Sequence, residues 1–340
     1  MKTSRIVALA LLSAVPVLAQ GGGGDASLEP KEWTVPWEKT RPRDPIMDQS
    51  GRVWFVGQTG NYVAYLDSKS GQFKKYQIED GTFPHNINLD ERGGVWFTGN
   101  RNGKLYSIDP ASGTLKTIVL DANVKDPHTM IWDKNGVAWF TAQQSNYVGR
   151  LDRATGTVRL WKTGERSRPY GIVLDSKGQP WFDLFGTNKV ATIDTKSMEL
   201  KEFPVPNERA RPRRIALTSD DAVWYGDYSR GFLGRVDPKT GSVEEWAMPF
   251  GAPSQPYAMT VDDRDRLWLV ETGVQPNRLV AFDAKTKSWV ASIAVPSNGS
   301  MQNTIRHMTF NRATREIWFG TDAGTIGAVK VPSELRKLTP

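Results

Sequence analysis

The chain contains three histidines, and all three stand in similar surroundings. His85 follows a proline in the stretch FPHNINLD, and His128 follows a proline in DPHTMIWD. His307 lies in NTIRHMTF, where an arginine stands in place of the proline. A neutral imidazole can accept a proton or bind a metal near neutral pH, so each histidine is a candidate for acid–base or ligand chemistry.

Each histidine lies eleven residues before a tryptophan, and this position, which we call the slot, recurs seven times. The slot residues are Arg43, His85, His128, Tyr170, Arg213, Tyr257 and His307. Arginine, histidine and tyrosine all donate hydrogen bonds from a flat, partly apolar side chain. The slot therefore has two readings: its side chains line a ligand site, or they join neighbouring repeats by hydrogen bonds to carbonyl groups.

Further charged residues accompany the slot. Arginines that suit bidentate recognition of carboxylate, sulfate or phosphate occur just before it, at Arg41, Arg168, Arg211 and Arg306. Acidic residues follow four of the tryptophans by two to four positions, at Asp183, Asp227, Glu271 and Asp322. These carboxylates could bind Mg²⁺ or Ca²⁺ through oxygen ligands, or they could pair with the arginines.

The composition excludes several kinds of chemistry. The 340-residue chain has no cysteine, which excludes disulfides, thiolate nucleophiles and cysteine-ligated metals. Its formal net charge of +7 is too modest to favour nucleic acid but suits an anionic ligand or an acidic polymer. The sequence contains no nucleophile elbow, P-loop, HExxH motif or EF-hand loop.

Residues 1–19 are typical of a secretory signal. Lys2 and Arg5 precede an apolar stretch that ends in small residues at Ala19, so we expect cleavage there and a periplasmic or secreted product. No later stretch approaches the ~20 apolar residues that a membrane helix needs. We expect residues 20–31, with four consecutive glycines, to form a flexible leader.

The elements that position the slot follow from the repeat. Its tryptophans lie 42, 43, 42, 43, 44 and 50 residues apart. Each repeat has four short runs with alternating apolar positions, separated by turns such as DERGG or PKTG, which predicts four antiparallel strands. Seven such repeats predict an all-β, seven-bladed β-propeller over residues 32–331, followed by a tail at 332–340.

The two ends of the chain predict how the ring closes. The last repeat lacks a fourth strand, and EWTVP at 32–36 is similar to the fourth strands EWAMP and EFPVP. We therefore expect this N-terminal run to complete the last blade and remove an open sheet edge. Because first strands line the channel of a propeller, the slots should meet at the rim where these strands begin, and a ligand pocket should form there.

The sequence of the blades resembles a known family. WFTAQQSNYVGRLDRATG at 139–156, with PHNINLD and RPYGIVLD, is similar to the virginiamycin B lyase (streptogramin lyase) family, and the likeness covers all seven blades. This resemblance implies a propeller that opens a cyclic depsipeptide by Mg²⁺-assisted elimination with a histidine as base. It also implies histidines in the last two slots and two metal-binding glutamates, one two residues before the final histidine and one ending that blade's second strand.

Carried over by position, these functional residues are only partly present. His307 stands at the final histidine, whereas Tyr257 replaces the other histidine and Ile305 replaces the first glutamate. The second glutamate falls near Asp322, or at Thr321 if the alignment shifts by one residue, and Glu271 on the neighbouring blade could supply a replacement ligand.

Two functions remain open from the sequence, and we expect a monomer in both. In the first, the protein is an exported lyase in which His307 is the base and Tyr257 assists it. Glu271 and Asp322 would hold Mg²⁺. A peptide ester or a uronate-type glycan would bind at the central funnel through Arg43, His85, His128, Tyr170, Arg213 and Arg306.

In the second, the protein is a non-catalytic propeller that binds a small ligand or a protein partner. A lactonase of the gluconolactonase type shares the fold but needs more acidic and asparagine ligands than the sequence offers.

Overall fold

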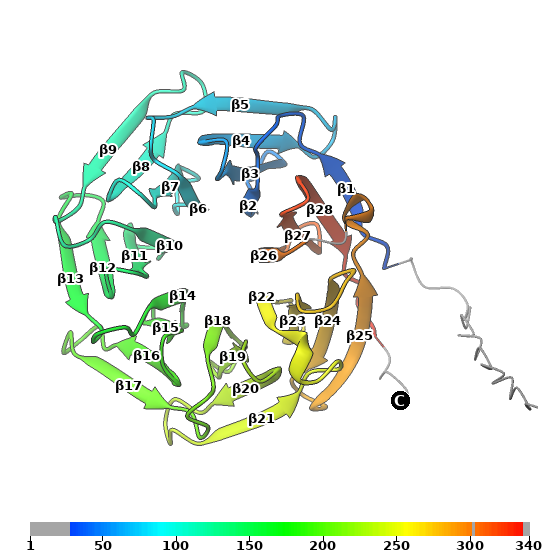
Figure 1. The fold of residues 1–340 in the computed structure, drawn as a ribbon. Helices are drawn as coiled ribbons and strands as arrows, with labels where there is room; N and C mark the ends of the chain where they lie inside the picture. Colours follow the sequence, from blue (N-terminus) through cyan, green and yellow to red (C-terminus); the bar gives the residue numbers. More distant parts are fainter. Residues whose placement is uncertain (1–27, 301–302, 336–340) are drawn as a thin grey trace, which may run out of the picture.

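The computed structural model describes residues 28–300 and 303–335, so the signal sequence and most of the leader lie outside the described residues. Within them, seven four-stranded sheets stand around a central axis (Figure 1). The predicted seven-bladed propeller is confirmed. No helix in this part of the chain has the length and apolar character needed to cross a membrane.

The first four blades follow the order of the sequence. Blade 1 consists of β2 (Pro42–Met47), β3 (Arg52–Gly57), β4 (Tyr62–Asp67) and β5 (Phe73–Gln77). Blade 2 consists of β6 (Pro84–Leu89), β7 (Val95–Gly99), β8 (Lys104–Ile108) and β9 (Leu115–Val119). Blade 3 consists of β10 (Pro127–Trp132), β11 (Val137–Ala142), β12 (Tyr147–Asp152) and β13 (Val158–Lys162). Blade 4 consists of β14 (Pro169–Leu174), β15 (Pro180–Leu184), β16 (Lys189–Ile193) and β17 (Leu200–Pro204).

The last three blades complete the ring. Blade 5 consists of β18 (Pro212–Leu217), β19 (Val223–Asp227), β20 (Phe232–Val236) and β21 (Val243–Ala247). Blade 6 consists of β22 (Pro256–Val261), β23 (Arg266–Glu271), β24 (Arg278–Asp283) and β25 (Ser288–Ala294). Blade 7 consists of β26 (Ile305–Asn311), β27 (Glu316–Thr321), β28 (Thr325–Lys330) and the N-terminal β1 (Lys31–Thr34).

The N-terminal strand closes the ring as predicted. β1 pairs antiparallel with β28, with Trp33 opposite Ile326. The indole of Trp33 stacks on Trp318 with 5.3 Å between ring centroids. The carboxylate of Glu32 accepts a hydrogen bond from the hydroxyl of Thr325 at 2.6 Å. The last blade is thus joined from both ends of the chain, and its outer edge is covered.

The repeated tryptophans pack between neighbouring blades. Trp54 of blade 1, which is fully buried, belongs to one apolar cluster with Ile87 and Phe97 of blade 2. In several blades an aspartate six residues earlier accepts the indole N–H, for example Asp262 from Trp268 at 3.0 Å. In these blades the spacing from turn to tryptophan is therefore structural, because the hydrogen bond holds the first hairpin together.

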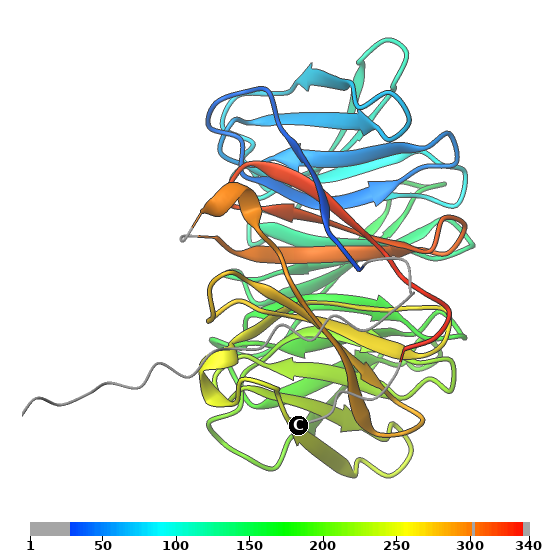
Figure 2. The same ribbon diagram turned by 90° about the vertical axis from the view of Figure 1, so that its right-hand side faces the viewer.

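The two faces of the ring differ. Two short 3-10 helices, Ala252–Ser254 and Ser297–Gly299, precede β22 and β26. Seen from the side, both lie on the left, where the first strands of the blades begin (Figure 2). We call this side the start face, and the opposite side, where the first strands end, the end face.

Candidate functional site

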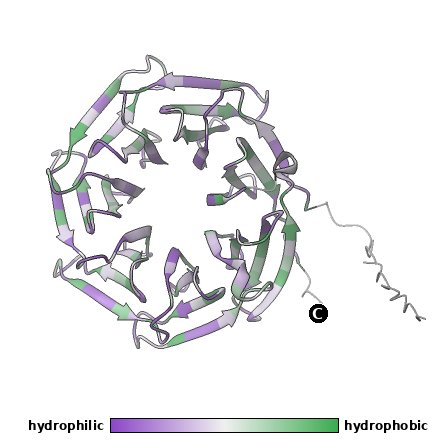
Figure 3. Cartoon of the chain, in the orientation of Figure 1, coloured by the Kyte–Doolittle hydropathy of each residue, from purple (hydrophilic) through white to green (hydrophobic). Residues whose placement is uncertain are grey.

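Every first strand carries a β-bulge just after its beginning. In blade 2, His85 and Asn86 of β6 together oppose the single residue Thr98 of β7. Such a bulge interrupts the alternation of side chains and re-aims them. The slot residue and the residue after it therefore both reach the channel, and hydrophilic colour marks the inner ends of β6 and β10 (Figure 3).

The last blade departs from the predicted spacing. Thr309 pairs with Trp318, nine residues away, whereas the equivalent Thr260 of blade 6 pairs with Trp268, eight residues away. The turn between β26 and β27 is therefore one residue longer than in blade 6. Counting back four residues from Thr309, as in the other blades, puts Ile305 in the place of the proline.

This shift changes the assignments in blade 7. The slot of this blade holds Arg306, and His307 lies one residue further along β26. The expectation that all three histidines share the slot is wrong. The family resemblance places a general base in this slot, and a guanidinium, which stays protonated in proteins, cannot accept a proton.

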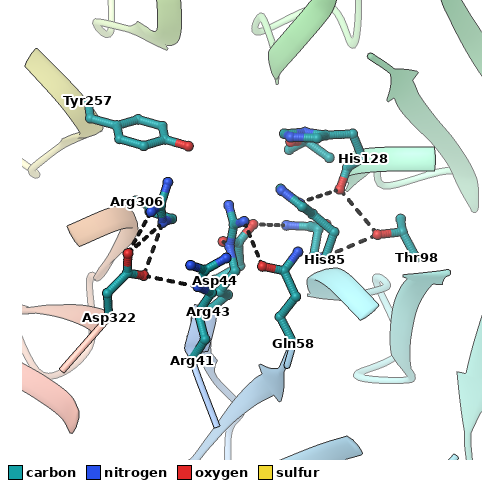
Figure 4. A network of polar contacts seen from close by, with 12 residues as sticks. Arg41, Arg43, Asp44, Gln58, His85, Thr98, His128, Tyr257, Arg306 and Asp322 are labelled. Carbon is teal, nitrogen blue, oxygen red and sulfur yellow. Dashed lines mark hydrogen bonds and ion pairs between the residues drawn. The ribbon is translucent and has the colours of Figure 1, made fainter. Parts of the chain in front are cut away.

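The slot residues close the channel on the start face. We call them the plug: Arg43, His85, His128, Tyr170, Arg213, Tyr257 and Arg306. Five of them are almost fully buried, with exposed fractions of 6% at Arg43, 4% at His85, 2% at His128, 3% at Tyr170 and 2% at Tyr257. The ring centroids of His85 and His128 lie 3.6 Å apart. Figure 4 shows plug side chains from different blades converging on the axis.

Two tyrosines of the plug lie next to arginines. The hydroxyls of Tyr170 and Tyr257 are hydrogen-bonded to each other. The guanidinium carbon of Arg213 lies 3.7 Å from the ring centre of Tyr257. Burial alone would raise the pKa of Tyr257, but the charges of four arginines, of which Arg213 acts most strongly, lower it to about 7. The arginine charges therefore favour the ionised form of Tyr257 relative to an ordinary tyrosine.

The histidines are neutral at pH 7. Burial and then the charges of nearby arginines lower the pKa of His85 and of His128 well below 6.5. Burial lowers the pKa of His307 to about 4, against the charge of Asp44, which raises it. The positive charge in the channel therefore comes from arginine side chains.

The residues after the slot form a second layer, which we call the floor: Asp44, Asn86, Thr129, Gly171, Arg214, Ala258 and His307. Arg214 is 3% exposed and donates from Nη1 to the hydroxyl of Thr129 at 3.4 Å. Its Nη2 has no hydrogen-bond partner among the described residues, and neither has Nδ1 of His307. The amide of Asn86, in contrast, donates to Asp44 at 2.9 Å and accepts from the backbone N–H of Met130 at 2.9 Å.

The floor and the adjacent plug carry surplus positive charge. Burial acts to raise the pKa of Asp44, but the charge that His307 carries when protonated at low pH, together with the charges of Arg43 and Arg214, outweighs burial and lowers that pKa. Nε of Arg43 lies 3.6 Å from Oδ1 of Asp44. One carboxylate thus faces two guanidiniums, and Nε and Nη2 of Arg43 also lack hydrogen-bond partners among the described residues.

A cavity of about 540 Å³ begins at the floor. Asn86, Thr129, Arg214 and His307 line its inner part, and later residues of the same first strands form its walls. These wall residues become more exposed along the strands, up to the exposed Arg312 that follows β26. The cavity therefore opens on the end face. The expectation of a pocket at the start-face rim is corrected, because plug side chains fill the channel there.

The two predicted metal ligands are engaged by other groups. Arg306 donates from Nε to Oδ1 of Asp322 at 3.0 Å, and Nε of Arg41 lies 3.6 Å from the same oxygen (Figure 4). Glu271 is fully buried and accepts from the hydroxyl of Ser254 at 2.8 Å and from a backbone N–H at 3.0 Å. Burial raises the pKa of Glu271, which favours its neutral form.

These residues do not fit a Mg²⁺ site. Mg²⁺ needs charged oxygen ligands in near-octahedral geometry. Asp322 is paired with arginines, and Glu271 accepts hydrogen bonds from the segment that connects β21 to β22. Among the described residues no group of three histidine or acidic side chains is placed to hold a metal ion.

The sequence does not single out Arg214 or Asp44. Strict strand alternation assigns the residue after the slot to the opposite side of the strand, away from the channel. The one signal for the bulge is the pair of polar residues after the proline, HN at 85–86, HT at 128–129 and RR at 213–214.

Several solved structures are similar to this propeller. A solved structure described as streptogramin B lyase has 22% identity and a TM-score of 0.79, covering 91% of this chain and 98% of that chain. A catalytically inactive virginiamycin B lyase from Staphylococcus aureus with quinupristin has 22% identity and a TM-score of 0.80, covering 89% and 99%. The WD40 propeller domain of Doa1 has 12% identity and a TM-score of 0.70, covering 89% and 98%. These likenesses show the fold.

A search of curated proteins found no match. The sequence does match the description "Virginiamycin B lyase family" over residues 72–338, which is most of the chain. The protein belongs to the virginiamycin B lyase family.

Proposed function

We propose that this protein is a binding propeller that holds an anion at the centre of its channel. The observation that supports it best is the buried guanidinium of Arg214, which lines the cavity and whose Nη2 has no partner among the described residues. Leaving a buried donor unpaired costs about 1–3 kcal/mol, and more for a charged group. An acceptor supplied by a ligand would remove that cost.

Two features favour binding over the elimination that is implied by the family. The slot expected to hold the base contains Arg306, whose guanidinium is paired with Asp322. The second expected ligand, Glu271, accepts a hydrogen bond from Ser254 in the segment before β22. The slot in which the family has its base therefore holds a residue that cannot accept a proton, and the two carboxylates expected to bind the metal are both engaged by other groups.

Thermal unfolding tests the anion site. Sodium acetate, compared with sodium chloride at equal ionic strength, should raise the unfolding midpoint of the parent by a few degrees at saturating concentration. Arg214→Gln should abolish this rise. Arg235→Gln, on β20 next to Asp220 and away from the cavity, should keep it. An equal rise in the parent and in Arg214→Gln would contradict the proposal.

An elimination reaction is the second candidate, and the ionisation of Tyr257 supports it. A phenolate with a pKa of about 7 and a neutral His307 are both able to accept a proton. Incubation with quinupristin, with and without Mg²⁺, followed by chromatography of the ring-opened product, separates the candidates. A binding propeller leaves the ring intact. Ring opening that is lost in Tyr257→Phe would establish the lyase instead.

A further inference from the structure

The cavity has two chemically different ends. Its floor is polar and includes Arg214 and His307, whose Nη2 and Nδ1 atoms are buried and have no hydrogen-bond partner in the described part of the chain. Its walls are mainly apolar and include Ile131, Ile172, Val173, Ile215, Met259 and Phe310. Apolar walls around a few well-placed polar groups are typical of a site for a small organic molecule. Such a site favours a ligand with one polar end and an apolar body.

The charged side chains at and next to the floor favour a ligand with a single negative charge. Arg43 and Arg214 bring two positive charges, and Asp44 brings one negative charge. Burial raises the pKa of Asp183, which interacts with the charge of Arg214, well above its usual value, so this carboxyl group favours its neutral form. A ligand with one negative charge would balance this group, whereas a phosphate dianion would leave excess negative charge in a buried place. A carboxylate also matches the donor geometry of a guanidinium.

The shape of the channel sets the direction of entry. The plug closes the start face, where Tyr257 and His128 are each 2% exposed. On the end face, the partly exposed Leu174 and Leu217 and the exposed Arg312 lie around the opening of the cavity. With a rise of ~3.3 Å per residue, the wall from Arg214 to Leu217 is about 10 Å long. That length accommodates a medium-length hydrocarbon chain or an aromatic ring system.

We propose that the cavity binds an apolar monocarboxylate, with its carboxylate on Nη2 of Arg214 and its apolar body along the first-strand walls. The ligand enters from the end face. This inference rests on the proposed anion site at Arg214 and adds the ligand class and the direction of entry. The neutral Nδ1 of His307 lies in the same floor and offers a second polar contact for the carboxyl group.

Calorimetric titration with decanoate, acetate and decanol tests the inference on the full chain. Decanoate should bind on the order of 100-fold more tightly than acetate, because each buried CH₂ group adds favourable free energy. Decanol should bind more weakly than decanoate by about 10-fold or more, because it lacks the charge that Arg214 binds. Arg214→Gln should remove this preference for decanoate over decanol, and Arg214→Lys should keep part of it.

A second variant tests the apolar wall separately. Thr260 lines the cavity and is partly exposed, so Thr260→Phe should place a ring in the space for the apolar body. We expect this variant to bind decanoate about 10-fold or more weakly than the parent does, because the new ring takes the space of the buried hydrocarbon chain. The affinity for acetate should be unchanged, because acetate does not reach this wall. Arg235→Gln is the matched control for both ligands.

The outcomes separate the two proposals. Equal affinities for acetate and decanoate, both dependent on Arg214, would overturn the apolar-ligand inference and leave the anion site intact. No binding of either anion, or decanoate binding equally well to the parent and to Arg214→Gln, would overturn both.

Discussion

The neutral histidines of the plug contribute to stability in a pH-dependent way. His85 donates from Nδ1 to the carbonyl of His128 at 3.1 Å, and its ring centroid lies 3.6 Å from that of His128. Its pKa is lowered on folding, so the unfolded chain binds more protons below the ordinary pKa of 6.5. The stabilisation from burying a neutral His85 is complete above pH 6.5 and is lost as the pH falls.

His85→Asn should therefore reduce the acid sensitivity of the protein. Asparagine can donate to the same carbonyl but does not titrate. Between pH 6.5 and about pH 5, the parent should lose about 2 kcal/mol more unfolding free energy than the variant. Denaturant unfolding at the two pH values measures this difference. The contribution of the carboxyl groups to the pH dependence is the same in both proteins and cancels in the comparison. Identical pH dependence in the two proteins would show that His85 is not held neutral.

Tyr257 should ionise far below the other tyrosines. Burial raises the pKa of Tyr225 and of Tyr62, whereas arginine charges lower that of Tyr257 to about 7. Tyrosinate absorbance should show one ionisation near pH 7 in the parent and none in Tyr257→Phe. Tyr225→Phe, the control, should keep it. Persistence of the low transition in Tyr257→Phe would assign it to another group.

At the scale of elements, the first hairpin of several blades depends on a turn aspartate. Asp262 is 1% exposed and accepts from the indole of Trp268 at 3.0 Å and from Nε of Arg266 at 2.6 Å. Asp133 occupies the same place in blade 3, is partly exposed and accepts from the backbone N–H of Val137 at 2.8 Å.

Asp262→Ala should consequently cost about 3 kcal/mol or more of unfolding free energy, because it leaves the buried charge of Arg266 unpaired. Asp133→Ala should cost about 1 kcal/mol, since it removes turn hydrogen bonds near solvent. Denaturant midpoints of both variants give the comparison. Equal losses would mean that the buried ion pair adds nothing to the hairpin.

The sequence predicts the elements well and the channel residues poorly, and the bulge explains why. The period of the tryptophans, and the likeness of EWTVP to the fourth strands, were sufficient to predict seven blades and the closing strand. The register of Arg306 and His307 depends on one extra residue in the turn of blade 7, which no apolar pattern marks. The role of Arg214 depends on a bulge that breaks the alternation used to assign faces.

At the scale of the whole molecule, the two faces of the channel have different roles. On the start face the arginines are largely engaged, Arg306 and Arg41 with Asp322 and Arg213 with the tyrosine rings. On the end face the cavity is open, and at its inner end lies Arg214, whose Nη2 has no hydrogen-bond partner within residues 28–300 and 303–335. The net charge of +7 adds a general attraction for anions. Export to the periplasm or medium stays a prediction from residues 1–19.

The most direct test of the central claim is a crystal structure with a decanoate that carries bromine at its far end. Anomalous scattering locates the bromine, and electron density locates the carboxylate. We expect the carboxylate at Nη2 of Arg214 and the bromine near Leu174 and Leu217, on the end-face side of the plug. A bromine on the start face, or an empty cavity in crystals saturated with the ligand, would contradict the account.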